Sequence, residues 1–289
     1  MQLYDEQIKT ELKERVERLE GRLKADVAFY CGPMHPAMQK LFRDFIEKLK
    51  AGSIGTNHLA LFLNTPGGSV ETVEKFVEIV RFHYGEVSFV VPDYAMSAGT
   101  VFCTSGDRIY MDYSSSLGPI DPQVFNGKDW VPALGYLDQV EKMLQKAADD
   151  KLTNAEFLIL QSQDLAMLSR YEQARALTVT LLKKWLVEYK FKDWTKHRTD
   201  PEKKNKQVTL AEKQTRAEEI AKLLGDNKTW HSHGRMIGPG TLTRALRLEI
   251  EDYSKDPELS RLIRSYNDFI VEYIARGDFK TFLHSKNYF

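Results

Sequence analysis

The feature that most constrains this fold is a pair of short apolar runs, each followed at once by a turn and a helical pattern. The first run, residues 59–63, ends at the turn 64–69 (NTPGGS), after which apolar residues recur at helical spacing. The second run, residues 87–91, leads through a proline into the small-residue segment 95–100 (AMSAGT). We interpret each as a strand, a turn and a helix, with Ser97 in the first turn of the second helix.

The same order repeats on both sides of this pair. Residues 26–31 form a short apolar run that predicts a strand, and an apolar helical stripe then runs from Met38 to Leu49 and ends at Gly52. Residues 108–111 predict a further strand. Strands that alternate with helices are typical of an α/β protein with a parallel sheet and right-handed crossovers.

Ser97 lies where a serine can act as a nucleophile. A serine hydroxyl reacts only with a base beside it and with donors for the oxyanion that forms after attack. A helix start supplies free backbone amides, and Gly67 and Gly68 carry no side chain that would cover further amides. Both turns follow predicted parallel strands, whose carboxyl ends bind ligands in open α/β sheets. Each feature alone also fits a purely structural role, as a tight turn and as a packed helix start.

Four phrases relate this sequence to a known group of enzymes. Residues 64–69, followed further along by 96–99 (MSAG), resemble the superfamily of Clp protease and signal peptide peptidase A. Residues 116–123 (SLGPIDPQ) and 232–237 (SHGRMI) are similar to phrases of its serine dehydrogenase proteinase branch. The resemblance implies an α/β fold of the crotonase and Clp-protease type, a spiral of ββα units, with a mainly helical C-terminal region.

The resemblance also implies an activity, that of a serine peptidase acting on polypeptides with Ser97 as the nucleophile. The backbone amides of Gly68 and Ala98 would hold the oxyanion, with Gly67 in the same turn. No cofactor is implied, and the sequence has no G-x-G-x-x-G turn for a dinucleotide despite the family name. Two other functions stay open: a crotonase-fold enzyme that processes acyl thioesters, and a catalytically silent scaffold that kept the fold for assembly.

This chain has no histidine in the region where Clp protease has its catalytic histidine. Clp protease places that histidine in the region after the strand predicted at 108–111, but no histidine lies between His83 and His197. Asp121 is the ionisable residue nearest that position. We expect Asp121 to fix the loop, because a carboxylate is a poor base for a serine.

Two residues remain as candidates for the general base. Signal-peptide-peptidase-like enzymes use a lysine after the nucleophile, and Lys151 lies at a comparable distance, with Lys142 and Lys146 as competitors. A lysine acts as a base only where burial keeps it neutral, and the ordinary state of a lysine is solvated. His233, in the family-like phrase, is the other candidate, although a histidine there also fits a turn between helices. We favour Lys151 slightly.

Charge and cysteine usage exclude several classes of partner. The 41 basic and 41 acidic residues balance, so nothing indicates a nucleic-acid partner. Cys31 and Cys103 are the only cysteines and form no disulfide framework or metal motif, which favours a reducing compartment. His231 and His233 lack a third ligand at metal spacing. There is no leader pattern and no apolar run of about 18 residues, so we expect a cytoplasmic protein without a membrane span.

We divide the chain into three regions. Residues 1–24 predict an amphipathic helix, residues 25–150 the Clp-like α/β peptidase core, and residues 151–289 a helical region. Within the last region, helices are predicted at 241–252 and 257–275.

Apolar stripes at the two ends of the chain offer surfaces for a closed homo-oligomer. One runs from Ile8 to Leu23 and the other from Leu259 to Ile274. We expect the first stripe to pack on its own domain rather than as an arm to another subunit, because about two heptads is short for a coiled coil.

Overall fold

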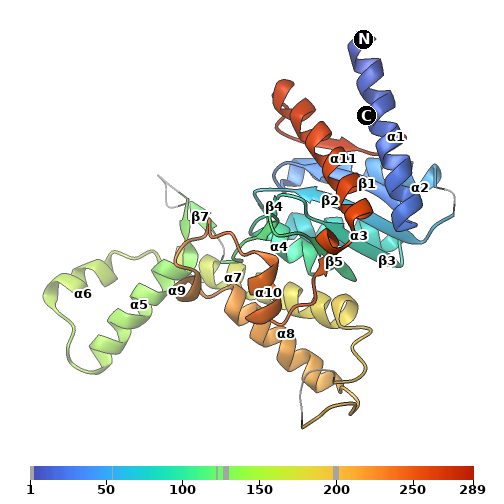
Figure 1. The fold of residues 1–289 in the computed structure, drawn as a ribbon. Coiled ribbons are helices and arrows are strands. Elements are labelled where there is room, and N and C mark those ends of the chain that lie inside the picture. The colour runs from blue at the N-terminus through green and yellow to red at the C-terminus, as the bar shows by residue number, and fades with distance from the viewer. Residues whose placement is uncertain (1–2, 54, 122, 126–129, 198–201) are drawn as a thin grey trace.

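The computed structural model describes residues 3–53, 55–121, 123–125, 130–197 and 202–289. Its centre is a six-stranded sheet in the order β10-β1-β2-β3-β5-β9 (Figure 1). The four inner strands run parallel and are β1 (Asp26–Cys31), β2 (His58–Asn64), β3 (Glu86–Val90) and β5 (Arg108–Met111). The apolar runs predict these four strands to within one residue at either end. The α/β class is therefore confirmed.

Helices cover both faces of this sheet. Alternate strand residues point to opposite faces, and apolar side chains on both faces are buried under helices. One face carries the 3-10 turn η1 (Pro36–Met38) with α2 (Gln39–Ala51), α3 (Val70–His83) and α4 (Ala98–Cys103). The other face carries α1 (Leu3–Leu23) and α11 (Pro257–Arg276). In β1, Ala28 and Tyr30 face the first set while Val27 and Phe29 face the second, and all four are fully buried. Burial on both faces explains why the strands read as continuous apolar runs.

The two apolar stripes considered for self-association pack against each other and against the sheet. Ile8 and Leu12 of α1 share one buried cluster with Ile263 and Ile270 of α11. The expected packing of the first stripe within its own chain is therefore confirmed. Because both stripes are already covered, they do not provide the subunit contacts that the sequence suggested, and a second copy would need another surface.

The chain beyond residue 150 is mainly helical, but it also completes the sheet. Its helices are α6 (Asn154–Gln161), α7 (Leu165–Trp185) with the π-helical end η2 (Leu186–Lys190), α8 (Leu210–Leu224), α9 (Asn227–Trp230), α10 (Pro239–Arg244) and the 3-10 turn η3 (Tyr253–Lys255). Two further strands from this region, β9 (Glu251–Asp252) and β10 (Phe282–His284), pair with β5 and β1. The division of the chain at residues 24 and 150 stays a prediction, with the sheet drawing on both sides of the second boundary.

The helix predicted at residues 241–252 is wrong beyond Arg244, that is, over residues 245–252. α10 ends at Arg244, and Arg247 has a positive φ of 46°, which a right-handed helix cannot include. Leu246 and Leu248 are both buried with an exposed residue between them, so this segment packs with a strand-like period of two. The run is too short for apolar spacing to separate the two patterns.

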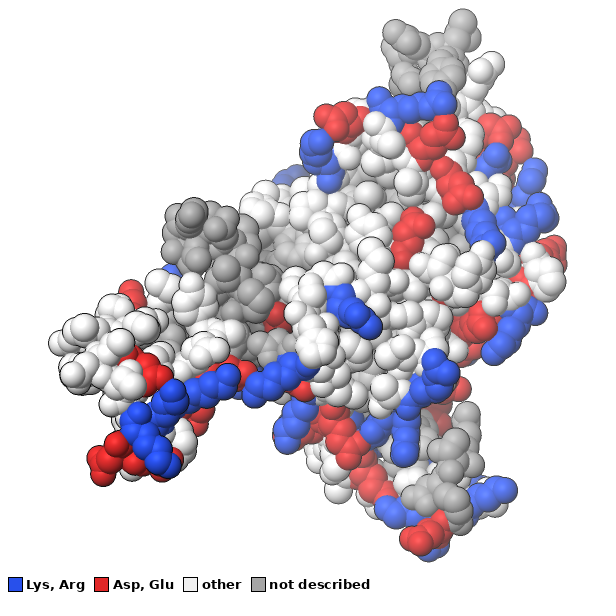
Figure 2. Space-filling model, turned by 60° about the vertical axis from the view of Figure 1, so that its left-hand side comes forward, with Lys and Arg blue, Asp and Glu red and all other residues white. Residues whose placement is uncertain are grey.

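A helical arm projects from the sheet domain (Figure 1). It consists of α5 (Ala133–Ala148), α6 and the first part of α7, and it follows the hairpin of β7 (Gln123–Phe125) and β8 (Trp130–Pro132). In Figure 2 much of the arm is uncharged surface, and both basic and acidic side chains lie along its lower edge. Among the side chains of the arm that the structure describes, five large apolar ones are more than half exposed, namely Leu144, Phe157, Leu158, Ile159 and Leu165. No helix in the described ranges has the length and apolar content needed to cross a membrane.

Candidate active site

Four short segments lie side by side at the carboxyl edge of the sheet. Thr65 bonds to β4 (Tyr94–Ala95) through its amide, 3.1 Å from Tyr94 O, and its carbonyl accepts from Met96 N at 2.9 Å. β4 pairs in parallel with β6 (Ser116–Leu117), and Leu117 pairs with Ile237 through hydrogen bonds of 3.0 and 2.8 Å. This ladder brings together the four phrases that carry the family resemblance.

Ser97 follows β4 almost directly and has an unusual backbone conformation. Its φ of 52° and ψ of −116° lie outside the regions that a residue with a side chain prefers. Such strain costs about 1–3 kcal/mol and is found mostly at functional sites, where the surrounding structure maintains it. α4 begins at the next residue, and the Ser97 side chain makes no capping bond to it. The hydroxyl is therefore not committed to the helix.

The glycine turn approaches Ser97 closely. Gly67 has a φ of 101°, and a Cβ atom on it would lie 2.7 Å from Met96 O and 2.9 Å from Ser97 Cβ. Only glycine fits here, because both the conformation and the clearance exclude a side chain. The Gly67 amide donates to Thr65 Oγ1 at 3.0 Å, so this amide is already in use.

The amides of Gly68 and Ala98, each next in sequence to a residue of this close approach, are the remaining candidate donors. Gly68 has a φ of 145° and pairs with Met34 in an isolated β-bridge. The hydrogen bonds of this bridge are donated by the amides of Met34 and Ser69, so the Gly68 amide takes no part in it. The Ala98 amide would lie 3.2 Å from a Cβ placed on Gly67, so it faces the glycine turn. Within the described ranges, neither amide has a hydrogen-bond acceptor. Two unsatisfied donors near a strained serine are what an oxyanion hole requires.

The loop after β6 is fastened to the start of α4 and to α8. The Gly118 amide donates to Thr100 Oγ1 of α4 at 2.9 Å. Two residues further along, the Ile120 amide donates to Leu224 O of α8 at 3.1 Å. These two bonds hold Asp121 between the helix that follows Ser97 and the C-terminal region.

Asp121 and His233 form a hydrogen-bonded pair, although they are 112 positions apart in the chain. Asp121 Oδ1 lies 2.9 Å from His233 Nδ1, and the side chains are 2% and 23% exposed, respectively. A buried carboxylate beside Nδ1 keeps that nitrogen protonated, so Nε2 is the atom free to accept a proton. No hydrogen bond joins Ser97 to His233 among the described contacts. Such bonds are often long in enzymes without substrate.

The lysines considered as bases lie elsewhere. Lys151 is in the turn between α5 and α6, with its side chain 75% exposed, and that turn lies far along the arm from β4 and α4 (Figure 1). Lys146 pairs with Glu156 at 2.5 Å, and Lys142 is exposed on α5. None of the three has the burial that keeps a lysine neutral.

From the sequence, Asp121 was expected only to fix the loop, and its pairing with His233 was not predicted. A buried aspartate is a poor base for a serine, but it can orient a histidine that acts as the base. The sequence contains one indication of this pair, since one family-like phrase contains the aspartate and another the histidine. The sequence does not show that the two phrases meet; the pairing of Leu117 with Ile237 brings them together in the fold.

Three comparisons relate this chain to known proteins. Residues 49–231 match the sequence model of the ClpP-like SDH-type serine proteinases. Two uncharacterized proteins of Methanocaldococcus jannaschii are 36% and 30% identical to this chain over 91 and 92 residues. Each of these matches covers 32% of this chain and only 30% of the relative's length.

Two solved structures resemble this one distantly, and both are of mutants of the 1510-N membrane-bound stomatin-specific protease. The first has a TM-score of 0.46 at 12% identity and covers 81% of this chain and 82% of that one. The second, in complex with a substrate peptide, has a TM-score of 0.33 at 19% identity and covers 42% and 59%.

Proposed function

We propose, because this chain belongs to the ClpP-like SDH-type serine proteinase family, that it hydrolyses peptide bonds with Ser97 as the nucleophile. The observation that carries the proposal is the strained backbone of Ser97, placed against the glycine turn and beside two unused amides. A serine with a purely structural role at a helix start needs neither a strained backbone nor a glycine turn packed against it.

The neighbouring residues suggest a role for each group in the reaction. Ser97 Oγ attacks the scissile carbonyl and passes its proton to His233 Nε2, while Asp121 stabilises the imidazolium that forms. The amides of Gly68 and Ala98 hold the oxyanion. His233 then gives its proton to the leaving amine, and a water molecule, activated by the same histidine, hydrolyses the acyl-enzyme.

We assign the general base to His233 rather than to Lys151, which reverses the slight preference drawn from the sequence. His233 has the buried carboxylate partner that orients a histidine base, and its phrase is joined to β6 of the ladder beside Ser97. Lys151 has neither burial nor a position near β4.

Digestion of an unfolded protein tests the activity. Wild type should degrade reduced, unfolded casein, and Ser97→Ala should lose nearly all of this activity with an unchanged circular dichroism spectrum. Ser169→Ala, which removes an exposed hydroxyl from α7, serves as the matched control and should keep full activity. Equal activity of Ser97→Ala and wild type would remove the nucleophile assignment, and no hydrolysis by wild type would favour the silent scaffold.

We also propose that the protein forms a homo-oligomer through its arm. Four large apolar side chains of the arm, those of Leu144, Phe157, Leu158 and Leu165, are 52–78% exposed. Exposed apolar side chains that gather on one projecting arm favour an interface. A closed assembly would enclose the active sites and keep them from folded proteins. Both cysteines are free, which supports a reducing location such as the cytoplasm.

A further inference from the structure

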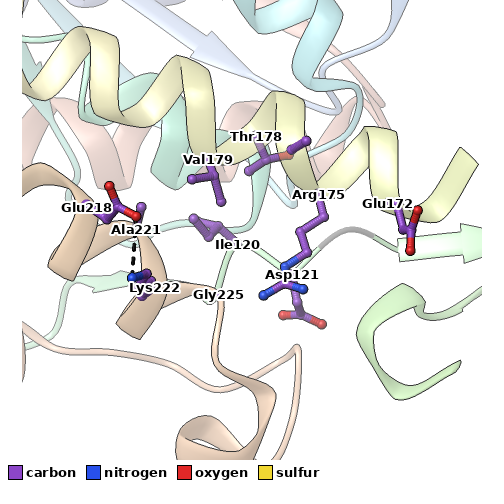
Figure 3. A pocket seen from close by; sticks show the side chains of 11 residues that line it. Ile120, Asp121, Glu172, Arg175, Thr178, Val179, Glu218, Ala221, Lys222 and Gly225 are labelled. Atoms are coloured by element: carbon purple, nitrogen blue, oxygen red, sulfur yellow. Dashed lines mark ion pairs between the residues drawn. The ribbon is translucent and has the colours of Figure 1, made fainter. Parts of the chain in front are cut away.

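The candidate base adjoins a cavity that the proposed reaction does not use. This cavity has a volume of about 410 Å³ and lies between α7 and α8, with Asp121 in its wall (Figure 3). Since Asp121 also binds His233, the cavity and the site share a residue. The cavity therefore borders the candidate base of the proposed reaction.

The floor of the cavity is buried and largely apolar. Ile120 and Ala221 are 3% and 0% exposed, and Thr178 is 3% exposed. The bond from the Ile120 amide to Leu224 O fixes the loop on α8 at this point. Such a floor suits the methylene groups of a side chain or a chain end, rather than a highly hydrated ion.

The charged groups around the cavity differ in whether they have partners. Glu218 binds Lys183 at 2.6 Å and Lys222 at 3.4 Å, so these charges on α8 are already matched. Arg175 of α7 makes no ion pair with any residue in the described ranges. Figure 3 shows its guanidinium reaching across the cavity toward Asp121 and away from Glu172.

From this arrangement we propose that the cavity is a substrate subsite that binds a carboxylate through Arg175. A guanidinium binds a carboxylate with two parallel hydrogen bonds, and the apolar floor takes the aliphatic stem that carries it. The carboxylate belongs either to an acidic side chain of the peptide or to its C-terminus. This inference rests on the proposed peptidase function, and it makes Arg175 a specificity-determining residue.

Binding to the inactive Ser97→Ala protein tests the subsite separately from catalysis. The probes are neutral decapeptides with one glutamate moved along the chain, each with its glutamine counterpart, and each with a free or an amidated C-terminus. We expect one glutamate position, or the free C-terminus, to bind on the order of tenfold more tightly than its neutral counterpart. A preference within amidated peptides identifies a side chain, and one found only with free termini identifies the chain end.

Variants of two arginines on α7 decide whether Arg175 is responsible. Adding Arg175→Gln should reduce the tenfold ratio to about one, and Arg175→Lys should keep part of it. Adding Arg170→Gln, an exposed arginine five positions earlier on the same helix, should leave the ratio unchanged. Equal binding of charged and neutral peptides, or a ratio that survives Arg175→Gln, would overturn the proposal. A preference that appears in binding although wild type cleaves none of the peptides would defeat the peptidase function alone.

Discussion

At Ser97 the backbone angles cost stability, and this cost can be measured without any assay of activity. A φ of 52° disfavours every residue that has a Cβ atom, so alanine keeps the strain and glycine removes it. We therefore predict that Ser97→Gly is more stable than Ser97→Ala by about 1 kcal/mol in urea unfolding. At Ser169, within helix α7, the order should be reversed, because glycine weakens a helix interior. The same order at both positions would mean that Ser97 is not strained.

The lack of space for a side chain at Gly67 predicts a loss of activity that the positive φ alone would not cause. Gly67→Ala should lower peptide hydrolysis on the order of a hundredfold, because its Cβ atom would displace Ser97 and the oxyanion donors. Gly55→Ala is the matched control, since Gly55 also has a positive φ, of 96°, but no atom within 4 Å of an added Cβ. It should lose a similar amount of stability from φ while keeping its hydrolysis rate. The measurement is the hydrolysis rate of each folded variant at saturating substrate. An equal loss of rate in Gly67→Ala and Gly55→Ala would contradict the close approach of Gly67 to Ser97.

Among the elements, strand β10 carries an ionisable group that links stability to pH. Burial lowers the pKa of His284 to about 3, and its Nδ1 lies 2.8 Å from the Tyr266 hydroxyl. In the unfolded chain the same histidine titrates near pH 6.5. Between these two values the unfolded state binds a proton that the folded state does not, so stability falls by about 1.4 kcal/mol for each unit that the pH is lowered below 6.5.

We therefore predict that His284→Gln unfolds with a shallower dependence on pH between 6 and 4 than wild type. The slope, rather than the absolute stability, is the readout, because the variant also changes a buried contact. His231→Gln, at an exposed histidine, should keep the wild-type slope. Urea unfolding at several pH values measures both, and identical slopes for wild type and His284→Gln would show that His284 is not buried as described.

Elements differed in how far the sequence could predict them. The inner strands were predictable because both of their faces are buried, which leaves continuous apolar runs such as residues 59–63. β9 and β10, of two and three residues, are too short to have a pattern and exist because a sheet edge is available. The stripe of α1 predicted a helix but not its partner, since periodicity gives the buried face of a helix and not what covers it.

The candidate site also has parts that local sequence predicts and parts that depend on long-range contacts. Ser97 and the glycine turn follow their strands directly, so local sequence places them at one edge of the sheet. The Asp121–His233 pair depends on the antiparallel bridge between Leu117 and Ile237, a long-range contact that no local pattern contains. Distance along the sequence favoured Lys151, but the chain between Ser97 and Lys151 leads out along the projecting arm.

At the scale of the whole molecule, the arm should decide self-association. We predict a homo-oligomer by light scattering at micromolar concentration, and a monomer when Phe157 and Leu158 are both replaced by serine. Both side chains are more than half exposed, so the loss should come from the interface rather than from the fold. Leu12→Ala, which removes a buried contact of α1, should lower the melting temperature without changing the mass. A wild-type monomer, or an oligomer indifferent to the arm variant, would refute this interface.

The rate at which a fluorophosphonate probe phosphonylates Ser97, with loss of fluoride, tests the nucleophile and the base together. Because His233 is the base held by a buried carboxylate, we predict that a His233→Ala variant is folded but reacts on the order of a thousandfold more slowly than wild type. A Lys151→Ala variant should react at the wild-type rate. An inert Lys151→Ala variant together with a fully reactive His233→Ala variant would contradict the assignment.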